Sequence, residues 1–421
     1  MYDVLNAYLE NGLKVIIHKI ANVKTMSCGL WIKQGSVHET DATNGLSHLI
    51  EHLLLNPDDV ENDNYKKLMM KVSADGVIYN AATTKEYTYF YFTGLENTLE
   101  ECLSCLSCIA KENRKFQESY FENEKNVVMQ EARSFYSSYQ QIKERTSQAI
   151  WGNRGNGKII MGDLENISNA KLEEVLEIIS NAYVPENATI VVVGNLDYQK
   201  TLTMIEEKFG DWHDGISNVF EIPVENVPGI YLNQGSGNSA VISIGFRAPS
   251  YGAKERVAAD MMVRILGNSG MQSRIVQEIR VKRGLSYTLG GFSSFYRNRG
   301  TIGFMSVCDK SKVLDVAKNM MDVLTGVKEK GFSEEEVERE KKIMETSVLL
   351  AVDNITEHLR YIGKCSVMDK NFYIENEVRA IRNTQKEDLE RVTLEILQES
   401  NMGLAAIGRC DFEELINTVS F

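Results

Sequence analysis

The feature that most constrains the fold of this chain is an internal repeat. A run of glutamate, lysine and aliphatic residues that starts at Phe116 recurs from Phe332, a shift of 216 residues. A second pair of segments, 194–197 and 408–411, shares its first and last residues, Gly and Asp, at a shift of 214. Two shifts that agree so closely predict the duplication of one unit of about 215 residues. The 421 residues are therefore expected to form two domains of one fold.

Local sequence patterns predict both strands and helices. Short β-rich or apolar runs predict strands at 13–20, 26–33 and 188–193, and a bent strand or hairpin at 78–93. Amphipathic patterns predict helices at 96–111, 116–138 and 168–182, and a short helix is expected at 209–212. No helical period survives across 213–229, which holds Pro223 and Pro228, so this window is the expected linker. The expected domains are then residues 1–212 and 230–421.

Composition argues against several classes of protein. The formal net charge of −13 disfavours a nucleic-acid-binding protein, which needs a basic surface. The same charge is compatible with plain solubility or with attraction of a cationic ligand such as a basic peptide. No apolar run approaches the ~20 residues that span a membrane, and residues 1–5 contain neither a basic region nor an apolar core, so secretion is not expected. The seven cysteines, an odd number, are then interpreted as reduced thiols of a cytoplasmic protein.

The predicted chemistry begins with two histidines that lie four residues apart. His48 and His52 share one face if residues 45–53 form a helix, and cap candidates at 41–44 favour a helix that starts there. Both imidazoles could then bind one zinc ion, with Glu51 beside them to take a proton from an activated water. This is the His-x-x-Glu-His motif of inverted zinc proteases.

A catalytic zinc ion takes three protein ligands, and the motif supplies two. The helix predicted at 116–138 carries Glu124 and Glu131 seven residues apart, and therefore on one face. Carboxylates at this spacing usually form a solvated stripe. Because the site lacks a ligand, we predict Glu131 as the third ligand and Glu124 as a residue that contacts the site or a ligand histidine.

The repeat provides an internal control. At the shift of 216 residues, the motif residues fall on Arg264, Gly267 and Asn268, and Glu131 falls on Ser347. The second copy thus keeps the scaffold pattern and lacks each proposed metal group. Residues that the fold alone requires are expected in both copies, so the difference favours a chemical role in the first.

Other patterns are weaker candidates for cofactor sites. Cys102, Cys105 and Cys108 have a spacing that could suggest an iron–sulfur site, but their leucine-rich helical segment favours small core residues. The segment 267–270 could be taken for a phosphate loop but lacks the required lysine and spacing. The remaining histidines lack partners at ligand spacing and are interpreted as structural or exposed: His18, His38, His213 and His358.

Four segments carry a resemblance to a known family. They are His48–His52, Asn80–Thr88, Asn126–Glu131 and Met271–Tyr287. On these residues the chain resembles the pitrilysin/insulinase family of inverted-motif metallopeptidases, in its short-chain branch with the mitochondrial processing peptidases. The resemblance covers nearly the whole chain, and the last segment is long and highly specific.

The resemblance implies roles for individual residues. Glu131 matches the third zinc ligand of the family, and Glu124 matches a position that supports the site. The strand with Asn80 and Ala81 resembles the edge strand to which a peptide substrate adds as an extra β-strand. Two residues of the second half match a pair that binds substrate and stabilises the tetrahedral intermediate: Arg280 and Tyr287.

The resemblance also implies the architecture and the assembly. Each half is expected to be an α+β domain, a mostly antiparallel sheet with helices packed on one face, and the two homologous domains are expected to enclose a cavity. One zinc ion is expected per chain. A homodimer is the first expectation, and a heterodimer with a related subunit is the alternative. The segment Leu53–Asp59 departs from the family pattern, and the resemblance implies that this change spares the ligands and alters a wall of the cleft.

The sequence therefore predicts a zinc-dependent endopeptidase that hydrolyses peptides or small unfolded polypeptides inside a closed chamber. A narrower alternative is a maturation peptidase for one ribosomally made peptide. The alternative from another class is a non-catalytic scaffold or partner subunit of a heteromeric complex. The combination of the two histidines, Glu51 and Glu131 argues against that alternative.

Overall fold

The chain forms two compact units in the computed structural model, which describes residues 3–56, 63–213, 217–221, 227–235 and 237–420. Unit 1 comprises Met1–Arg133, Ile159–Ile222 and Leu350–Phe372. Unit 2 comprises Ser134–Lys158, Pro223–Leu349 and Tyr373–Phe421. Each unit thus takes one segment from the other half of the sequence, and in this the units differ from the predicted domains 1–212 and 230–421. Part of the predicted linker, namely 214–216 and 222–226, lies outside the described residues.

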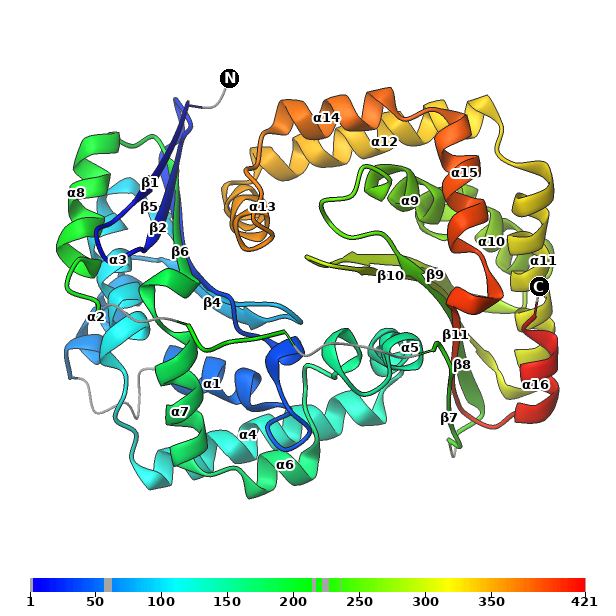
Figure 1. Ribbon diagram of the computed structural model, residues 1–421, viewed down its shortest axis with the longest axis horizontal. Coiled ribbons are helices and arrows are strands. Elements are labelled where there is room, and N and C mark those ends of the chain that lie inside the picture. Colours follow the sequence, from blue (N-terminus) through cyan, green and yellow to red (C-terminus); the bar gives the residue numbers. More distant parts are fainter. Residues whose placement is uncertain (1–2, 57–62, 214–216, 222–226, 236, 421) are drawn as a thin grey trace. The chain divides into compact units, whose positions relative to one another are not determined.

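Unit 1 is built on a six-stranded sheet with the order β1-β2-β6-β3-β5-β4 (Figure 1). Its strands are β1 (Asp3–Tyr8), β2 (Lys14–Lys19), β3 (Thr25–Ile32), β4 (Ile78–Thr83), β5 (Thr88–Leu95) and β6 (Ala188–Gly194). Neighbouring strands are antiparallel except β2 and β6, which are parallel. Every residue of β6, Ala-Thr-Ile-Val-Val-Val-Gly, is buried, because helices cover both faces of the sheet at this strand.

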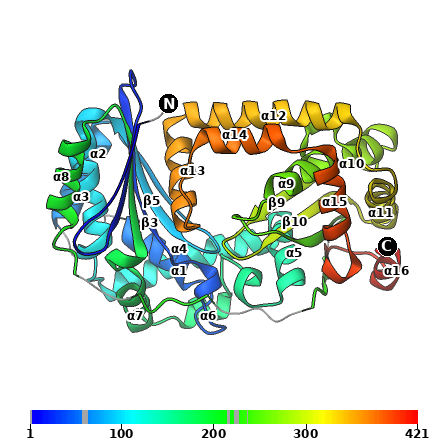
Figure 2. The same cartoon turned by 45° about the horizontal axis from the view of Figure 1, so that its top comes forward.

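The helices of unit 1 lie on both faces of its sheet. They are α1 (Leu46–Leu55), α2 (Asp63–Ala74), α3 (Leu99–Ser107), α4 (Glu118–Ser137), α6 (Leu164–Asn169), α7 (Leu172–Ala182), α8 (Tyr198–Phe209) and α13 (Ile355–Val367). The exchanged helix α13 packs on β3 and β6, on the face opposite to α1 and α3 (Figures 1 and 2). Gly363 permits this approach, since a Cβ there would lie 2.0 Å from the Trp31 ring. Thr189 and Ser366 join the helix to β6 by a hydroxyl hydrogen bond of 2.9 Å.

Unit 2 is built on a five-stranded sheet with the order β7-β11-β8-β10-β9. Its strands are β7 (Ile230–Asn233), β8 (Ser239–Ala248), β9 (Ser286–Phe295), β10 (Gly300–Asp309) and β11 (Met402–Ile407). Only β7 and β11 pair in parallel. Its helices are α5 (Ile142–Trp151), α9 (Arg256–Val263), α10 (Arg274–Val276), α11 (Val313–Lys330), α12 (Glu334–Asp353), α14 (Ile374–Asn383), α15 (Lys386–Ile396) and α16 (Phe412–Thr418). The exchanged helix α5 packs on β8 and β11, where Thr146 donates to Ser243 at 2.8 Å.

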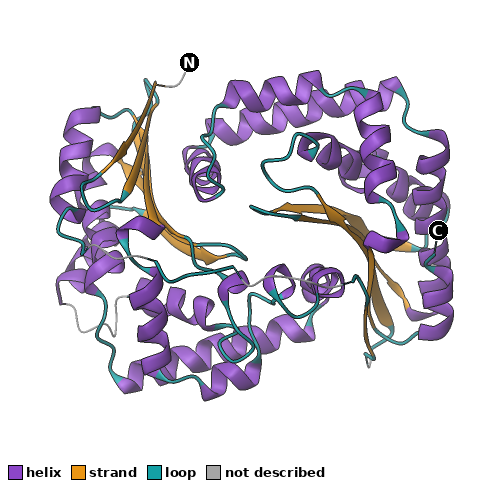
Figure 3. Cartoon of the chain, viewed as in Figure 1, coloured by secondary structure: helices purple, strands orange, loops and turns teal. Residues whose placement is uncertain are grey.

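The predicted duplication is visible in the order and length of the elements. The order β2-β6-β3-β5-β4 in unit 1 corresponds to β7-β11-β8-β10-β9 in unit 2, and β1 has no counterpart among the described strands. Helices α4 and α12 both have 20 residues and begin 216 positions apart. Figure 3 shows the same mixture of helices and strands in both halves. The predicted α+β fold of two similar, mostly antiparallel domains is confirmed, with one exchanged helix on the second face of each sheet.

Two local predictions had different outcomes. The short helix expected at 209–212 is wrong, because the helix there is α8, which ends at Phe209. Its start is fixed by Asp197, whose side chain accepts a hydrogen bond from the backbone N–H of Lys200 at 2.8 Å. The cysteines of the α3 segment are buried free thiols, as the core interpretation predicted: Cys102, Cys105 and Cys108.

Candidate metal centre

Helix α1 carries the predicted motif, and a buried carboxylate fixes where the helix begins. Glu39 accepts hydrogen bonds from the backbone N–H groups of Gly45 at 2.9 Å and Ser47 at 2.8 Å, and from Asn44 Nδ2 at 2.8 Å. Burial raises the pKa of Glu39, and these hydrogen bonds lower it. A negative group at a helix N-terminus satisfies free N–H groups and interacts favourably with the helix dipole. The cap is therefore Glu39, and not a residue of 41–44 as the sequence suggested.

Glycine is required where the chain enters α1. Gly45 has φ +104°, a conformation that side chains disfavour. A Cβ on Gly45 would also lie 2.8 Å from the Cα of Gly162, in the segment before α6. This close approach holds the first turn of α1 against the rest of unit 1.

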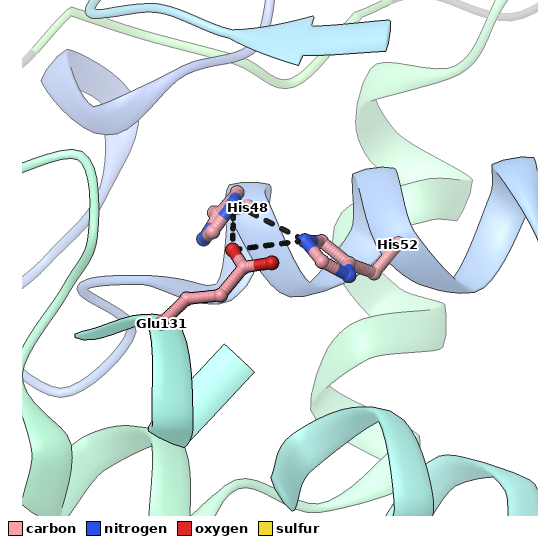
Figure 4. Close-up of side chains that lie close together, drawn as sticks. All are labelled: His48, His52 and Glu131. Carbon is pink, nitrogen blue, oxygen red and sulfur yellow. Dashed lines mark hydrogen bonds and ion pairs between the residues drawn. The ribbon is translucent and has the colours of Figure 1, made fainter. Parts of the chain in front are cut away.

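The structure brings three predicted ligand atoms together (Figure 4). His48 Nε2 and His52 Nε2 are 3.3 Å apart, and Glu131 Oε2 lies 3.6 Å from the first and 3.5 Å from the second. Nitrogen and oxygen ligands at ~2.0–2.2 Å from a tetrahedral zinc ion are separated by about 3.3–3.6 Å. The three atoms therefore have the spacing of one zinc coordination face. Among the described residues, no other group of three histidine, cysteine or acidic side chains is gathered this closely.

A second carboxylate fixes the tautomer of one ligand histidine. Glu124 Oε2 lies 3.3 Å from His52 Nδ1, and Glu124 Oε1 accepts a hydrogen bond from Asn56 Nδ2 at 2.9 Å. The hydrogen bond to His52 lowers the pKa of Glu124. Burial lowers the pKa of His52, but Glu124 and the other nearby carboxylates raise it more. With its Nδ1 proton directed at Glu124, His52 keeps the Nε2 lone pair for a metal.

His48 is held neutral by its surroundings. Burial and the neighbouring His52 lower the pKa of His48 to about 3. Its Nδ1 is buried and has no hydrogen-bond partner in the described part of the chain. A neutral imidazole with Nε2 aimed at a second nitrogen and a carboxylate is the protonation state that a zinc ligand requires.

Glu51 lies beside the three ligand atoms but is not one of them. Its Oε2 accepts a hydrogen bond of 2.6 Å from the hydroxyl of Thr83, the last residue of β4. Burial raises the pKa of Glu51, and the hydrogen bond from Thr83 lowers it. A half-buried carboxylate next to a metal site, with a raised pKa, suits a group that accepts a proton and then returns it.

The predicted substrate-binding residues lie on two different elements. Asn80 and Ala81 lie on β4, one of the two edge strands of the unit 1 sheet, and Asn80 Oδ1 accepts a hydrogen bond from the backbone N–H of Ala81 at 2.9 Å. In unit 2, the guanidinium carbon of Arg280 lies 4.2 Å from the centre of the Tyr287 ring. Tyr287 is 78% exposed, whereas Arg280 is half-buried. The roles of these four residues toward a substrate stay predictions.

The second copy uses an arginine where the first uses a histidine. Glu340 lies 216 residues after Glu124 and is fully buried. It accepts a hydrogen bond from Arg264 Nε at 2.5 Å. In this contact Arg264 takes the place that His52 has beside Glu124. The ungapped comparison instead aligns Arg264 with His48, one helical turn before His52. Unit 2 therefore keeps the carboxylate of the scaffold and neutralises it with a cation that cannot bind a metal.

Sequence reasoning missed three residues that contact the site. Glu39, Asn56 and Thr83 each hydrogen-bond to α1 or to a side chain of the site from another turn or strand. Thr83 lies inside the segment Asn80–Thr88, and the family resemblance of that segment was the signal that could have pointed to it. Nothing in the spacing of the other two predicts their contacts. The segment after Asn56 that departs from the family pattern includes residues 57–59, which lie outside the described residues.

Two models of one peptidase family match adjoining parts of the chain. The model described as insulinase (peptidase family M16) matches residues 14–164, and the M16 inactive-domain model matches residues 169–344. The chain belongs to the M16 peptidase family. The inactive-domain match to residues 169–344 of this M16 chain includes Arg264, Gly267 and Asn268, the positions that lack the motif residues.

Similar proteins from bacteria span nearly the same length as this M16 chain. An uncharacterised zinc protease of Bacillus subtilis is 24% identical over 91% of this chain and 92% of its own length. An uncharacterised zinc protease of Rickettsia felis is 27% identical over 90% of this chain and 92% of its own.

Solved structures share the fold of the M16 chain. A protease from Helicobacter pylori matches with a TM-score of 0.90 at 18% identity, over 97% of this chain and all of that one. A chain in a structure of complex III from Candida albicans matches with a TM-score of 0.86 at 16% identity, over all of both chains. In the part of the chain that the structure describes, no helix has the length and apolar character to cross a membrane.

Proposed function

We propose that this chain is a zinc-dependent endopeptidase that hydrolyses peptides or small unfolded polypeptides. The observation that carries the proposal is the triangle of His48 Nε2, His52 Nε2 and Glu131 Oε2, with separations of 3.3–3.6 Å. Two imidazole nitrogens and one carboxylate are the ligand set of catalytic zinc sites that keep an open position. The zinc-protease names of the bacterial relatives support the choice of metal.

The residues of unit 1 divide the chemistry between them. His48, His52 and Glu131 hold the metal, one ion per chain, and Glu124 keeps His52 in the tautomer that can bind it. A zinc ion bound there supplies a Lewis acid that activates water and polarises a peptide carbonyl. Glu51 takes the proton released when water attacks the carbonyl and passes it to the leaving amine.

The substrate is proposed to be an extended peptide. The outer edge of β4, with Asn80 and Ala81, offers backbone groups to which such a peptide can add as a further strand. Arg280 and Tyr287 of unit 2 are proposed to bind the substrate and stabilise the tetrahedral intermediate. The net charge of −13 favours cationic peptides among the substrates.

The decisive experiment combines metal analysis with cleavage of a mixed peptide library. The wild-type protein is expected to contain one zinc ion per chain and to cleave peptides internally, as read by mass spectrometry. Glu51→Gln is expected to keep zinc and lose cleavage. Glu122→Gln, which removes a charge from the surface of α4, is the matched control and should keep both. A zinc-loaded protein that cleaves nothing, or an active Glu51→Gln variant, would refute the proposal.

A narrower function is a maturation peptidase for one ribosomally made peptide. The departure from the family pattern in Leu53–Asp59 favours a specialised substrate. The same peptide library distinguishes the two possibilities, because a maturation peptidase cleaves few members and a general oligopeptidase cleaves many.

The second candidate function is a non-catalytic scaffold or partner subunit of a heteromeric complex. The inactive-domain match and the fold shared with a chain of complex III favour it. The retained ligand set and Glu51 favour the peptidase. Light scattering of the purified chain tests the assembly: we propose a homodimer, and a monomer that is completed only by a related subunit would favour the second candidate.

A further inference from the structure

A threonine on the outer strand of unit 1 hydrogen-bonds to the proposed catalytic carboxylate. Thr83 ends β4 and pairs in register with Thr88 of β5. Its hydroxyl lies 2.6 Å from Glu51 Oε2, 3.2 Å from Thr88 Oγ1 and 3.4 Å from the Ser47 carbonyl oxygen. These three oxygens are the acceptors available to one hydroxyl proton.

The neighbouring threonine settles where the proton of Thr83 points. Thr88 is fully buried, and its hydroxyl lies 3.0 Å from the carbonyl oxygen of Gln34, which can only accept. Thr88 therefore donates to Gln34 and has no proton left for Thr83. The Thr83 proton goes to Glu51, because the carboxyl oxygen at 2.6 Å is the nearest acceptor of the three.

The direction of this hydrogen bond fixes the carboxylate of Glu51. One oxygen, Oε2, is held by β4, so rotation of the carboxyl group breaks a short hydrogen bond. The second oxygen remains for proton transfer. We propose that Thr83 is a positioning residue for Glu51, which holds one carboxylate oxygen so that the other is aimed at the reacting water. This role rests on the proposed peptidase function.

Three variants separate a positioning role from a merely structural one. Thr83→Val removes the hydroxyl at nearly constant shape, and Thr83→Ser retains it. Thr189→Val is the matched control, because Thr189 is buried on the same sheet and hydrogen-bonds to Ser366 far from Glu51 in sequence. All three keep the backbone of β4 and the zinc ligands.

The kinetic expectation follows from the share of general base catalysis in the rate. Thr83→Val should lower kcat about 10- to 100-fold, part of the ~10²–10⁴-fold that a positioned base contributes. KM and zinc content should change less than about twofold, because Thr83 binds neither. Thr83→Ser should recover kcat to within about threefold of wild type, and Thr189→Val should leave it unchanged.

Several outcomes would overturn the assignment. A wild-type kcat in Thr83→Val would do so. A loss of kcat in Thr83→Ser or in Thr189→Val as large as the loss in Thr83→Val would also do so. A crystal structure of Thr83→Val gives a readout that needs no activity. There the Glu51 carboxylate should leave its orientation or occupy two. An unmoved Glu51 refutes positioning, whereas a wild-type protein without peptidase activity refutes the proposed function alone.

Discussion

A buried histidine pair makes the stability of unit 1 depend on pH. His18 on β2 and His358 on the exchanged helix α13 are 2% and 0% exposed, and His18 Nδ1 lies 3.3 Å from His358 Nε2. Burial and the facing His358 lower the pKa of His18 to about 3, and burial lowers that of His358 to about 4. Both imidazoles are therefore neutral in the folded protein at pH 7.

The sign and size of the effect follow from proton linkage. An unfolded histidine has a pKa of about 6.5, so the unfolded chain binds protons first as the pH falls. The stability that the pair contributes is complete above pH ~6.5 and is lost as the pH falls toward the folded pKa values. When the pH falls from 7 to 5, each histidine lowers the free energy of unfolding by about 2 kcal/mol, and the pair lowers it by about 4 kcal/mol.

Denaturant unfolding at pH 7.0 and pH 5.0 measures this loss. The comparison is between wild type and His18→Leu/His358→Leu, which replaces both partners by apolar side chains. Wild type and the double variant contain the same other titrating groups. The difference between their losses of stability therefore isolates the contribution of the histidine pair. Wild type should lose about 4 kcal/mol more than the double variant. His213→Gln, at an exposed histidine, is the control and should behave as wild type. Equal losses within about 1 kcal/mol would refute the linkage argument.

Three further predictions concern the metal, the exchanged helix and the substrate. Glu124→Ala should weaken zinc affinity about 10- to 100-fold in chelator competition, and Glu131→Ala should weaken it more; the reverse order would mean that the ligand is misassigned. Gly363→Ala, which places a Cβ 2.0 Å from a buried ring, should destabilise unit 1 by about 3 kcal/mol in thermal unfolding. Gly326→Ala in α11 meets nothing within 4 Å and should not destabilise unit 2. Arg280→Ala should lower kcat/KM and leave zinc content unchanged, and a parallel loss of zinc would contradict a role in substrate binding.

The sequence predicted what local patterns and the repeat determine. The apolar run at 188–193 is β6, and the helix expected at 116–138 is α4 at Glu118–Ser137. The pairing of His48 with His52 follows from helical spacing alone. Glu131 was predicted as a ligand because a zinc site with three protein ligands lacked one of them, and α4 carries Glu131 on the same face as Glu124.

These local patterns did not predict the exchange of helices between the two halves of the sequence. The amphipathic character of α13 specifies an apolar face and says nothing about which sheet it covers. The choice is made by contacts far apart in sequence, such as Gly363 against Trp31 and Thr189 with Ser366. Thr83 was missed for a similar reason. Its distance of 2.6 Å from Glu51 depends on how β4 packs on α1, across 32 residues of chain.

The two copies together separate what the scaffold needs from what the metal needs. The buried carboxylate of Glu124 recurs as Glu340, so this position belongs to the duplicated fold. An unpaired charge there would cost several kcal/mol, and each copy supplies a partner: His52 in unit 1 and Arg264 in unit 2. Glu131, in contrast, aligns with Ser347, as expected for a residue whose proposed role is to bind the metal. Glu124→Ala should therefore lower both the stability of unit 1 and its zinc affinity. Glu131→Ala should lower the zinc affinity alone, and its stability without metal should equal that of the wild type.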